Sequence, residues 1–321
     1  MIDTRSLITP HLIRNKNFYV AYSGGVDSTV LLKEVCEAAK KVNCNVTAIH
    51  INHGYSKFSD NWEQHCEKFC IEHDYPLQKF SLNIAEAEGA SLESVMREKR
   101  YEIFQSLIGK NETLFMGHHL DDQIETLFFR ILRGSGLKGS SSIPFKRNLG
   151  KGLLVRPFLN LSKKEIYEIA KLKKLKFIED ESNKDIKFDR NFLRNEVIEK
   201  ISERWPNYRK SLSKYIENQK SSHEFLKEIT TIELKKILHG KNIDVNKLKK
   251  YDSKYQKILI LQWLEMNNCN SPSSSALDEL TKFFVSSEKT KEPKFIWGSK
   301  EKGNYICLKI KKGIISIESN P

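Results

Sequence analysis

Residues 18–28 read F-Y-V-A-Y-S-G-G-V-D-S, an apolar and aromatic run followed by a turn of small residues. Phe18–Tyr22 are β-prone and predict a buried strand, and the apolar residues at 30–32 predict that a helix begins soon after the turn. A glycine turn between a strand and a helix presents backbone N–H groups at the start of the helix. The stretch therefore predicts a site that binds phosphate.

The turn has the chemistry that such a site needs. Gly24 and Gly25 lack Cβ atoms, so the backbone can adopt positive φ and bring its N–H groups close to an anion. Ser23 and Ser28 contribute hydroxyl groups, and Asp27 can hold a Mg²⁺ ion that screens a polyphosphate. Neither G-x-x-x-x-G-K-[ST] nor G-x-G-x-x-G surrounds the turn, which argues against a kinase or dehydrogenase loop. The alternative is a turn that only reverses the chain.

The string S-G-G-V-D-S resembles the S-G-G-x-D-S loop of the N-type ATP pyrophosphatases, which split ATP into AMP and pyrophosphate while adenylating a substrate. The resemblance implies an α/β fold with a doubly wound, mainly parallel sheet of the adenine nucleotide α hydrolase type, followed by a smaller, mostly helical C-terminal domain. It also implies ATP and Mg²⁺ as ligands, with ATP bound by Ser23, Gly24, Gly25, Val26, Asp27 and Ser28.

A second polar group follows the next expected strand. Residues 45–52 read N-V-T-A-I-H-I-N and predict a buried strand that ends in His50, Asn52 and His53. The carboxyl ends of parallel strands border the ligand crevice, so we expect this group to face the same site as the glycine turn. A single histidine after a strand is more often structural, but two with an asparagine beside a nucleotide loop favour a functional role.

A third group, G-H-H-L-D-D-Q-I-E-T at 117–126, follows a strand expected at 113–116. Clustered carboxylates beside an ATP site suit Mg²⁺ binding or a base for an incoming amine. The alternative is a helix N-terminus capped by Asp121 with acidic residues in its first turn, which does not explain the two histidines. The side chains of interest here are His118, His119, Asp121, Asp122 and Glu125.

The order of motifs resembles the tRNA(Ile)-lysidine synthase family. After S-G-G-V-D-S come H-I-N-H-G at 50–54, the 117–126 string, L-R-G-S-G-L-K-G at 132–139, V-R-P-F-L at 155–159 and D-E-S-N-K-D-I-K-F-D-R-N-F-L-R at 180–194. The match covers about residues 17–206. One departure is Tyr55-Ser56-Lys57, where the family usually has Leu-Arg after H-x-N-H-G, and it leaves that contact open.

The resemblance implies ligation of free L-lysine to C2 of the wobble cytidine of the CAU-anticodon isoleucine tRNA. An adenylated cytidine is the intermediate, and lysidine, AMP and pyrophosphate are the products. The implied catalytic residues are Asp27, Asp121, Asp122 and His53, with Asp27 and Asp122 as Mg²⁺ ligands; which carboxylate is the base stays open. The implied substrate-binding residues are His50, Asn52, His118, His119, Arg190 and Arg194.

Arg190 and Arg194 lie four positions apart, so their guanidinium groups can share a helix face and grip a phosphate or a carboxylate. The alternative for this pair is an ion pair with one of the nearby acidic residues Asp185, Asp189 and Glu196.

The 321 residues carry a net charge of +13, which is unevenly distributed: −1 for residues 1–100, +7 for 101–217 and +7 for 218–321. This excess fits a polyanionic partner such as RNA, although a lysine-rich composition is the alternative. We expect a catalytic domain at 1–206, a helical linker at 207–240 and a small helical tRNA-binding domain at 241–321. The last of these ends in a β-hairpin, with β-like runs at 294–297, 305–310 and 314–317.

No run of 18 apolar residues and no signal-peptide core is present, so we expect a cytoplasmic protein that does not bind membranes. The six cysteines form no C-x-x-C pair, and we expect them to be reduced and structural. This argues against a tRNA thiolase, which shares the loop but needs reactive or cluster-binding cysteines. Amidating synthetases for small molecules and a tRNA-binding module with structural ATP remain as alternatives. A homodimer is left open.

Overall fold

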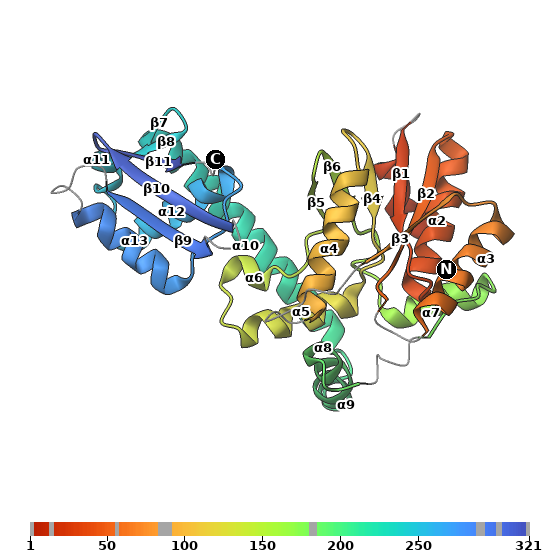
Figure 1. Ribbon diagram of the computed structural model, residues 1–321. Helices are drawn as coiled ribbons and strands as arrows, with labels where there is room; N and C mark the ends of the chain where they lie inside the picture. The colour runs from red at the N-terminus through yellow and green to blue at the C-terminus, as the bar shows by residue number, and fades with distance from the viewer. Residues whose placement is uncertain are drawn as a thin grey trace. The chain divides into compact units, whose positions relative to one another are not determined.

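The computed structural model describes residues 3–12, 16–54, 58–82, 92–179, 185–286, 293–299 and 304–318. The chain divides into two compact units, Met1–Lys220 and Ser221–Pro321 (Figure 1). The boundary lies inside a single long helix, α10 (Tyr208–Ile237). Among the helices of these ranges, none combines the length and apolar character that a bilayer crossing requires.

The first unit contains a six-stranded sheet with the order β3-β2-β1-β4-β6-β5. All neighbouring pairs are parallel except β5 and β6, which confirms the expected mainly parallel sheet. The strands are β1 (Asn17–Ala21), β2 (Asn45–Asn52), β3 (Leu77–Ser81), β4 (Thr113–Phe115), β5 (Lys146–Leu149) and β6 (Gly152–Val155).

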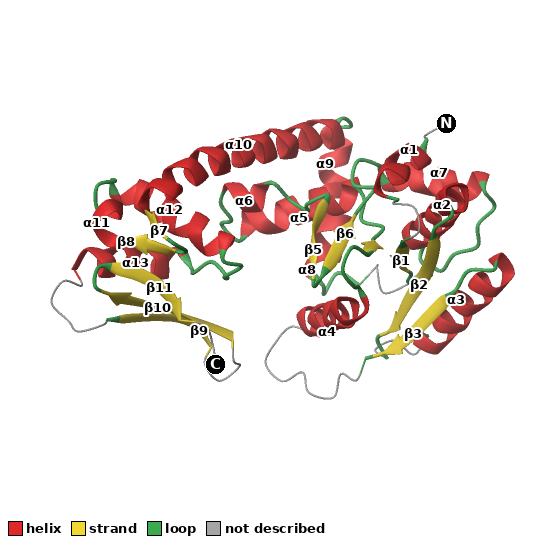
Figure 2. Ribbon diagram, turned by 90° about the horizontal axis from the view of Figure 1, so that it is seen from above, coloured by secondary structure: helices red, strands yellow, loops and turns green. Residues whose placement is uncertain are grey.

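Helices cover both faces of this sheet, because alternate strand residues point to opposite sides. Phe18 and Val20 of β1 belong to one core, whereas Tyr19 and Ala21 contact the other. The first core lies under α1, α2, α3 and α7, and the second lies under α4 (Figure 2). These helices are α1 (Thr4–Ile8), α2 (Val26–Val42), α3 (Ser59–His73), α4 (Leu92–Leu107) and α7 (Lys163–Leu172).

Shorter helices complete the first unit around a small separate core. Ile124, Ile198 and Tyr208 are buried there and join α5, the η3 segment and the start of α10. The elements are η1 (Thr9–His11), α5 (Leu120–Leu132), α6 (Leu137–Ser140), α8 (Asp189–Phe192), η3 (Leu193–Ile198), which is a π-helical turn, and α9 (Glu199–Arg204).

The second unit has its own core and a five-stranded antiparallel sheet with the order β7-β8-β11-β10-β9. Trp263 is fully buried in this core and donates its indole N–H to the Lys241 carbonyl oxygen (2.8 Å). The three strands expected from the sequence are present, and two short strands add to them. The elements are β7 (Leu238–His239), β8 (Asn242–Asp244), α11 (Val245–Leu248), α12 (Ser253–Met266), α13 (Ser274–Ser286), β9 (Lys294–Ser299), β10 (Asn304–Lys311) and β11 (Ile314–Glu318).

All six cysteines are free thiols. Burial raises the pKa of Cys36, Cys66 and Cys70 to about 12, so these thiols stay protonated at neutral pH. A protonated buried thiol is neither a nucleophile nor a metal ligand. The three therefore act as small apolar side chains of the first core.

Candidate functional site

The site lies at the topological switch point of the sheet, where the order in which strands are added changes side. From β1 the chain builds β2 and β3 on one side and then crosses to β4 on the other. Loops at the carboxyl ends of two strands separate at such a point and leave a crevice for a ligand. Gly117, directly after β4, shows how closely the two loops approach, because a Cβ atom there would lie 3.1 Å from the carbonyl oxygen of Asp27.

The glycine turn after β1 has the conformation expected for an anion cradle. Gly24 has φ +84°, and a Cβ atom on it would lie 2.8 Å from Ile178 Cδ1 and 2.9 Å from Cys66 Sγ. Gly25 is the N-cap of α2 and provides no side-chain acceptor for the first N–H groups of that helix. These amide groups are therefore left for a ligand.

Hydroxyl groups stabilise the turn from within. The Ser23 N–H donates to Ser28 Oγ (3.2 Å), and Ser28 Oγ donates to the Gly25 carbonyl oxygen (3.0 Å). Thr29 Oγ1 donates to the same carbonyl oxygen (2.9 Å). The Ser28 hydroxyl thus holds the loop in shape.

Two carboxylates converge on one imidazole beside this turn. His119 Nε2 lies 3.6 Å from Asp27 Oδ1 and 3.5 Å from Asp122 Oδ2. Asp27 Oδ2 accepts a hydrogen bond from Lys163 Nζ (2.5 Å), whereas Asp27 Oδ1 is buried and has no hydrogen-bond donor among the described residues. A buried carboxylate oxygen without a donor is costly, which makes it a natural ligand for a cation.

The N-cap of α5 is His119, not Asp121 as the sequence suggested. The Asp122 N–H donates to His119 Nδ1 (3.4 Å), and the His119 N–H donates to Asp122 Oδ2 (2.9 Å). Because Nδ1 accepts a hydrogen bond, we assign the proton of the neutral imidazole to Nε2. That N–H faces the carboxylates of Asp27 and Asp122.

Asp121 is held by two donors from distant parts of the chain. Its Oδ2 accepts from the Lys163 N–H (2.8 Å) and its Oδ1 from Arg209 Nε (2.7 Å). Burial alone would raise the pKa of Asp121, but the bonds from Lys163 and Arg209 outweigh it and lower the pKa. Asp121 therefore stays ionised and connects α5 to the first turns of α7 and α10.

Arginine side chains surround His118, the other member of the histidine pair. Arg156 is only 2% exposed, and it donates from Nε to His118 Nδ1 (3.3 Å) and from Nη1 to the Pro144 carbonyl oxygen (2.7 Å). Burial, and then the charges of Arg156 and Arg100, lower the pKa of His118 well below its usual value. His118 is therefore a neutral donor through Nε2.

The positive charge extends around the buried ring of Tyr101. The guanidinium carbons of Arg97 and Arg147 lie 5.3 and 4.6 Å from its centroid. Burial would raise the pKa of Tyr101, but Arg97, Arg156 and Arg147 together lower it. We use the name arginine cluster for this electrostatically linked set, which comprises Arg97, Arg100, Arg130, Arg147, Arg156 and Arg190.

The polar residues at the end of β2 are largely engaged with the protein. His50 Nδ1 lies 3.0 Å from the Tyr22 carbonyl oxygen, and the Asn52 amide donates to carboxylates of α3, Asp60 (3.2 Å) and Glu63 (3.1 Å). For His53, burial lowers the pKa to about 4, with further contributions from Arg100 and His50. His53 is thus neutral and electrostatically linked to the arginine cluster. The departure at 55–57 lies outside the described residues.

Arg194 makes an ion pair with a partner that the sequence did not suggest. It donates to both carboxylate oxygens of Glu125, from Nε (2.7 Å) and Nη2 (3.0 Å), and not to Asp185, Asp189 or Glu196. Burial raises the pKa of Glu125 despite this bond. The pair joins η3 to α5.

Similar proteins agree with this geometry. A family model described as a PP-loop domain matches residues 3–201. The tRNA(Ile)-lysidine synthase of Coxiella burnetii is 33% identical over 269 residues, and that of Buchnera aphidicola subsp. Schizaphis graminum is 34% identical over 314 residues. The chain belongs to the tRNA(Ile)-lysidine synthase family of PP-loop proteins.

The alignments cover most of this chain but a smaller share of each family member. The two alignments include 84% and 95% of this chain but 60% and 69% of the respective relatives. The Pseudomonas putida family member is 41% identical over 228 residues. That alignment includes 71% of this chain and 53% of the relative. The chain thus spans between about half and two thirds of the length of these synthases.

A solved structure supports the fold alone. The U34-tRNA thiolase NcsA from Methanococcus maripaludis aligns with a TM-score of 0.53 at 19% identity, over 67% of this chain and 77% of that protein. Together with the family model, it confirms the expected PP-loop α/β fold.

The structure brings most of the residues singled out in the sequence to one edge of the sheet, in two adjoining groups. Asp27, Asp121, Asp122 and His119 form the first, and His118, His53 and Arg190 are linked to the arginine cluster. Lys163, Arg209 and Arg156 were not anticipated as site residues. Arg156 lies within V-R-P-F-L, Lys163 follows that string, and Arg209 follows Trp205-Pro206. Each is a single basic residue, and no sequence pattern connects the three.

Proposed function

We propose that this chain ligates free L-lysine to C2 of the wobble cytidine of the CAU-anticodon isoleucine tRNA and consumes ATP, giving lysidine, AMP and pyrophosphate. The observation that carries the proposal is the convergence of Asp27 and Asp122 on His119 Nε2 beside the glycine turn. The family supports the tRNA substrate, since relatives over most of the chain are named for it.

In this proposal the terminal phosphates of ATP lie on residues 23–28. Gly24 and Gly25 let the phosphates approach the backbone, and the first N–H groups of α2 donate to them. Lys163 reaches the same place from α7 and adds a positive charge next to the leaving pyrophosphate.

The residues present fit a Mg²⁺ ion that is shared with the nucleotide. Asp27 supplies a buried oxygen without a hydrogen-bond donor, and Asp122 lies across the same imidazole. Within the described ranges, no three His, Cys, Asp or Glu side chains form a group that could hold a metal ion by themselves. When bound, Mg²⁺ would neutralise charge on the pyrophosphate.

The reaction requires two displacements. The C2 oxygen of cytidine attacks the α-phosphorus of ATP, and the bond to the β-phosphate breaks with its electrons on pyrophosphate. The ε-amine of lysine then attacks C2, and the C2–O bond breaks to release AMP. The amine must lose a proton, and we favour Asp122 as the base, because Asp121 is already held by Lys163 and Arg209.

The arginine cluster is the proposed contact for the RNA backbone near the reacting nucleotide. Arg97 and Arg147 hold guanidinium groups beside the Tyr101 ring, and guanidinium groups match phosphate geometry, whereas the buried Arg156 holds His118 in place. Arg190 is a candidate for the lysine carboxylate or the adenylate phosphate. We also propose that the second unit binds the tRNA body, since residues 218–321 carry a net charge of +7.

The test is incorporation of labelled lysine into a tRNA transcript with a CAU anticodon, with pyrophosphate release followed in parallel. We expect both signals to require ATP, and incorporation to be lost when the wobble cytidine is replaced. Asp122→Asn should slow lysine transfer more than pyrophosphate release. Pyrophosphate release with no lysine incorporation would contradict the proposal, and binding of tRNA without any release would favour an RNA-binding module.

A further inference from the structure

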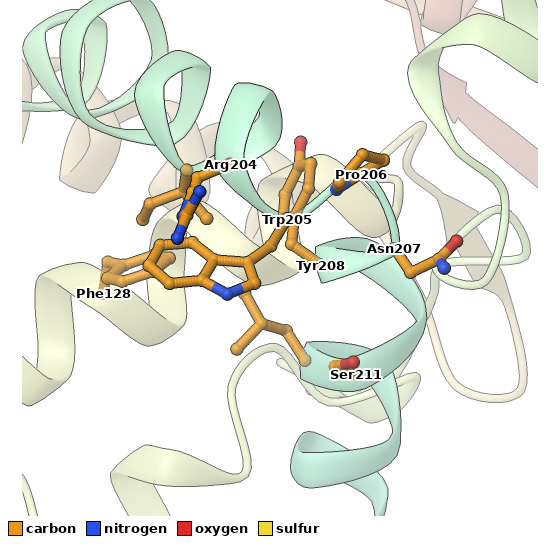
Figure 3. A pocket seen from close by; sticks show the side chains of 9 residues that line it. Phe128, Arg204, Trp205, Pro206, Asn207, Tyr208 and Ser211 are labelled. Carbon is orange, nitrogen blue, oxygen red and sulfur yellow. The ribbon is translucent and has the colours of Figure 1, made fainter.

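A pocket of about 430 Å³ lies between α5, α9 and the start of α10, separate from the polar groups of the catalytic site (Figure 3). Its lining is mainly aromatic and aliphatic, with Phe128, Trp205, Tyr208 and Leu212 as the main apolar contributors. This volume is in the range of pockets that bind small organic groups. None of these residues belongs to the proposed reaction.

Trp205 is exposed at the rim of this pocket in a defined orientation. The residue is 61% exposed, and its backbone N–H donates to the Ile201 carbonyl oxygen (2.8 Å) at the end of α9. Pro206 follows and restricts its backbone. Within the described part of the chain, the Trp205 indole N–H has no hydrogen-bond acceptor, whereas those of Trp263 and Trp297 have one.

The residues beneath Trp205 are part of a packed core or contact it. Tyr208 is 4% exposed and belongs to the small core that joins α5, η3 and α10, and Phe128, Ile201 and Leu212 pack against that core. Large exposed aromatic residues on a packed base offer a flat apolar surface at little cost in conformational entropy. Such a surface can stack a planar ligand.

The charge around the pocket favours an anionic planar ligand. Arg204 lines the pocket beside Trp205 (Figure 3). The Arg209 guanidinium lies 4.8 Å from the centroid of the Tyr208 ring. We infer that this pocket stacks an unpaired nucleobase of the RNA substrate on Trp205, while Arg204 contacts its phosphate. Stacking on aromatic rings next to arginine is the usual way in which proteins hold splayed single-stranded bases.

The pocket is also connected to the catalytic site through one helical turn. Arg209, next to Tyr208 in the first turn of α10, donates to Asp121 Oδ1 (2.7 Å). An RNA whose wobble base occupies the catalytic site therefore has a neighbouring binding position within the same unit. The inference rests on the proposed function, because it assumes that RNA is the partner.

The experiment measures the affinity of an anticodon stem-loop RNA for the full chain and for Trp205→Ala, Trp205→Phe and Ile71→Ala. We expect Trp205→Ala to weaken binding roughly ten- to hundredfold, as loss of one stacked base does. Trp205→Phe should restore the affinity to within a few fold. Ile71 is 74% exposed on α3 of the first unit, outside the pocket, and is the control, which should bind like the wild type.

Three further readouts make the result decisive. The thermal midpoint of each variant and its affinity for ATP should be unchanged, since Trp205 is exposed and makes no contact with residues 23–28 among those described. RNA should quench a fluorescence component that Trp205→Phe lacks. Unchanged RNA affinity of Trp205→Ala overturns the inference even if lysine transfer is normal, whereas absent lysine transfer with weakened RNA binding by Trp205→Ala contradicts only the proposed function. A wild-type chain that binds no RNA contradicts both.

Discussion

Asp27 has two carboxylate oxygens in different surroundings. Oδ2 is neutralised by Lys163, whereas Oδ1 is buried beside His119 without a hydrogen-bond donor among the described residues. An oxygen of this kind lowers the stability of the free protein and favours binding of a cation. In the proposed function, Asp27 is therefore a metal ligand that is in place before the nucleotide binds.

We expect Asp27→Asn to fold normally and to lose pyrophosphate release by roughly two orders of magnitude, as for loss of a group that stabilises charge in a transition state. The amide cannot replace a carboxylate that binds Mg²⁺, so the Mg²⁺ concentration needed for half-maximal ATP binding should also rise. Isothermal titration with Mg²⁺ and ATP checks this. Normal turnover by the variant would rule out the role of Asp27.

His53 provides a pH-dependent contribution to stability. Its pKa is about 4 in the folded protein, lowered by burial, and near 6.5 when unfolded. The unfolded chain therefore binds more protons between pH 6.5 and 4, so the free energy of unfolding decreases as the pH falls through this window.

His53→Gln removes this titration, so we expect the variant to lose less stability than the wild type between pH 7.5 and 5. Urea denaturation at both pH values gives the comparison. A stability difference between the two proteins that is the same at pH 7.5 and 5 would contradict the low pKa.

At the scale of elements, the strand, turn and helix at 17–42 depend on two glycines for different reasons. Gly24 has φ +84° and no room for a Cβ atom, since Ile178 and Cys66 lie within 2.9 Å of its position. Gly25 has φ −71°, and Ser23 Oγ, at 3.6 Å, is the only atom of the described residues within reach of an added Cβ. The first glycine is needed for the fold of the turn, and in the proposed function the second gives the phosphate access to the backbone.

Gly24→Ala should therefore reduce stability by about 1–3 kcal/mol, because it combines backbone strain with steric overlap. Gly25→Ala should leave the thermal midpoint nearly unchanged and weaken ATP binding, because the added methyl group faces the ligand. Differential scanning fluorimetry and nucleotide titration distinguish the two effects. Equal loss of stability in both variants would contradict this division.

The contact between α5 and η3 depends on the Arg194–Glu125 pair. Glu125 is buried, and its two carboxylate oxygens accept both bonds from Arg194. Removal of one member of such a pair leaves a buried charge without compensation, whereas replacement of both members costs less.

We expect Arg194→Met to lower the free energy of unfolding by about 3 kcal/mol. The double variant Arg194→Met with Glu125→Gln should recover part of this loss. Denaturant titration of the single and double variants forms the test. Additive losses would show that the two side chains do not act as a pair.

At the scale of the whole molecule, positive charge is the main property. The net charge of residues 1–100 is −1 and that of the rest of the chain is +14, which together give +13. The excess therefore belongs to the second half of the catalytic unit and to the second unit. Affinity from such charge depends on the release of counterions from the nucleic acid.

We expect RNA binding to weaken by at least tenfold when the salt concentration rises from 50 to 200 mM, while ATP binding at constant free Mg²⁺ changes much less. The expectation follows because many lysine and arginine side chains would contact RNA phosphates, whereas in the proposed function ATP contacts one glycine turn and few charged side chains. Filter binding at several salt concentrations gives the slope. An RNA affinity that is insensitive to salt would argue against a polyanionic partner.

Local chemistry made much of the site predictable. The apolar runs of β1 and β2, the glycines at 24 and 25 and the polar residues at the ends of β2 and β4 depend on short stretches of chain. Parallel pairing of β1 with β2 and β4 then brings the strand ends to one edge. For this reason Asp27, His119 and Asp122 could be placed together before their coordinates were known.

Contacts between distant residues could not be predicted in this way. Lys163 reaches Asp27 across 136 positions and Arg209 reaches Asp121 across 88, and no period or motif relates these pairs. The same holds for Arg194, whose partner Glu125 lies 69 positions away. These pairs were decided by the packing of α5, α7, η3 and α10, which sets which polar groups lose water together. The cap of α5 is a local contact, but the motif offered two candidates, and His119 takes the place of the expected Asp121.

The sequence alone determined the strand, glycine turn and helix, the family and the excess of positive charge, because each of these is a property of neighbouring residues or of composition. Only the tertiary structure decided which side chains neutralise Asp27 and Asp121, that five arginines gather around Tyr101 and His118, and that Trp205 is exposed at the rim of a pocket. Electrostatic and stacking interactions act over a few ångströms in space, and the distance along the chain does not reveal which groups come that close.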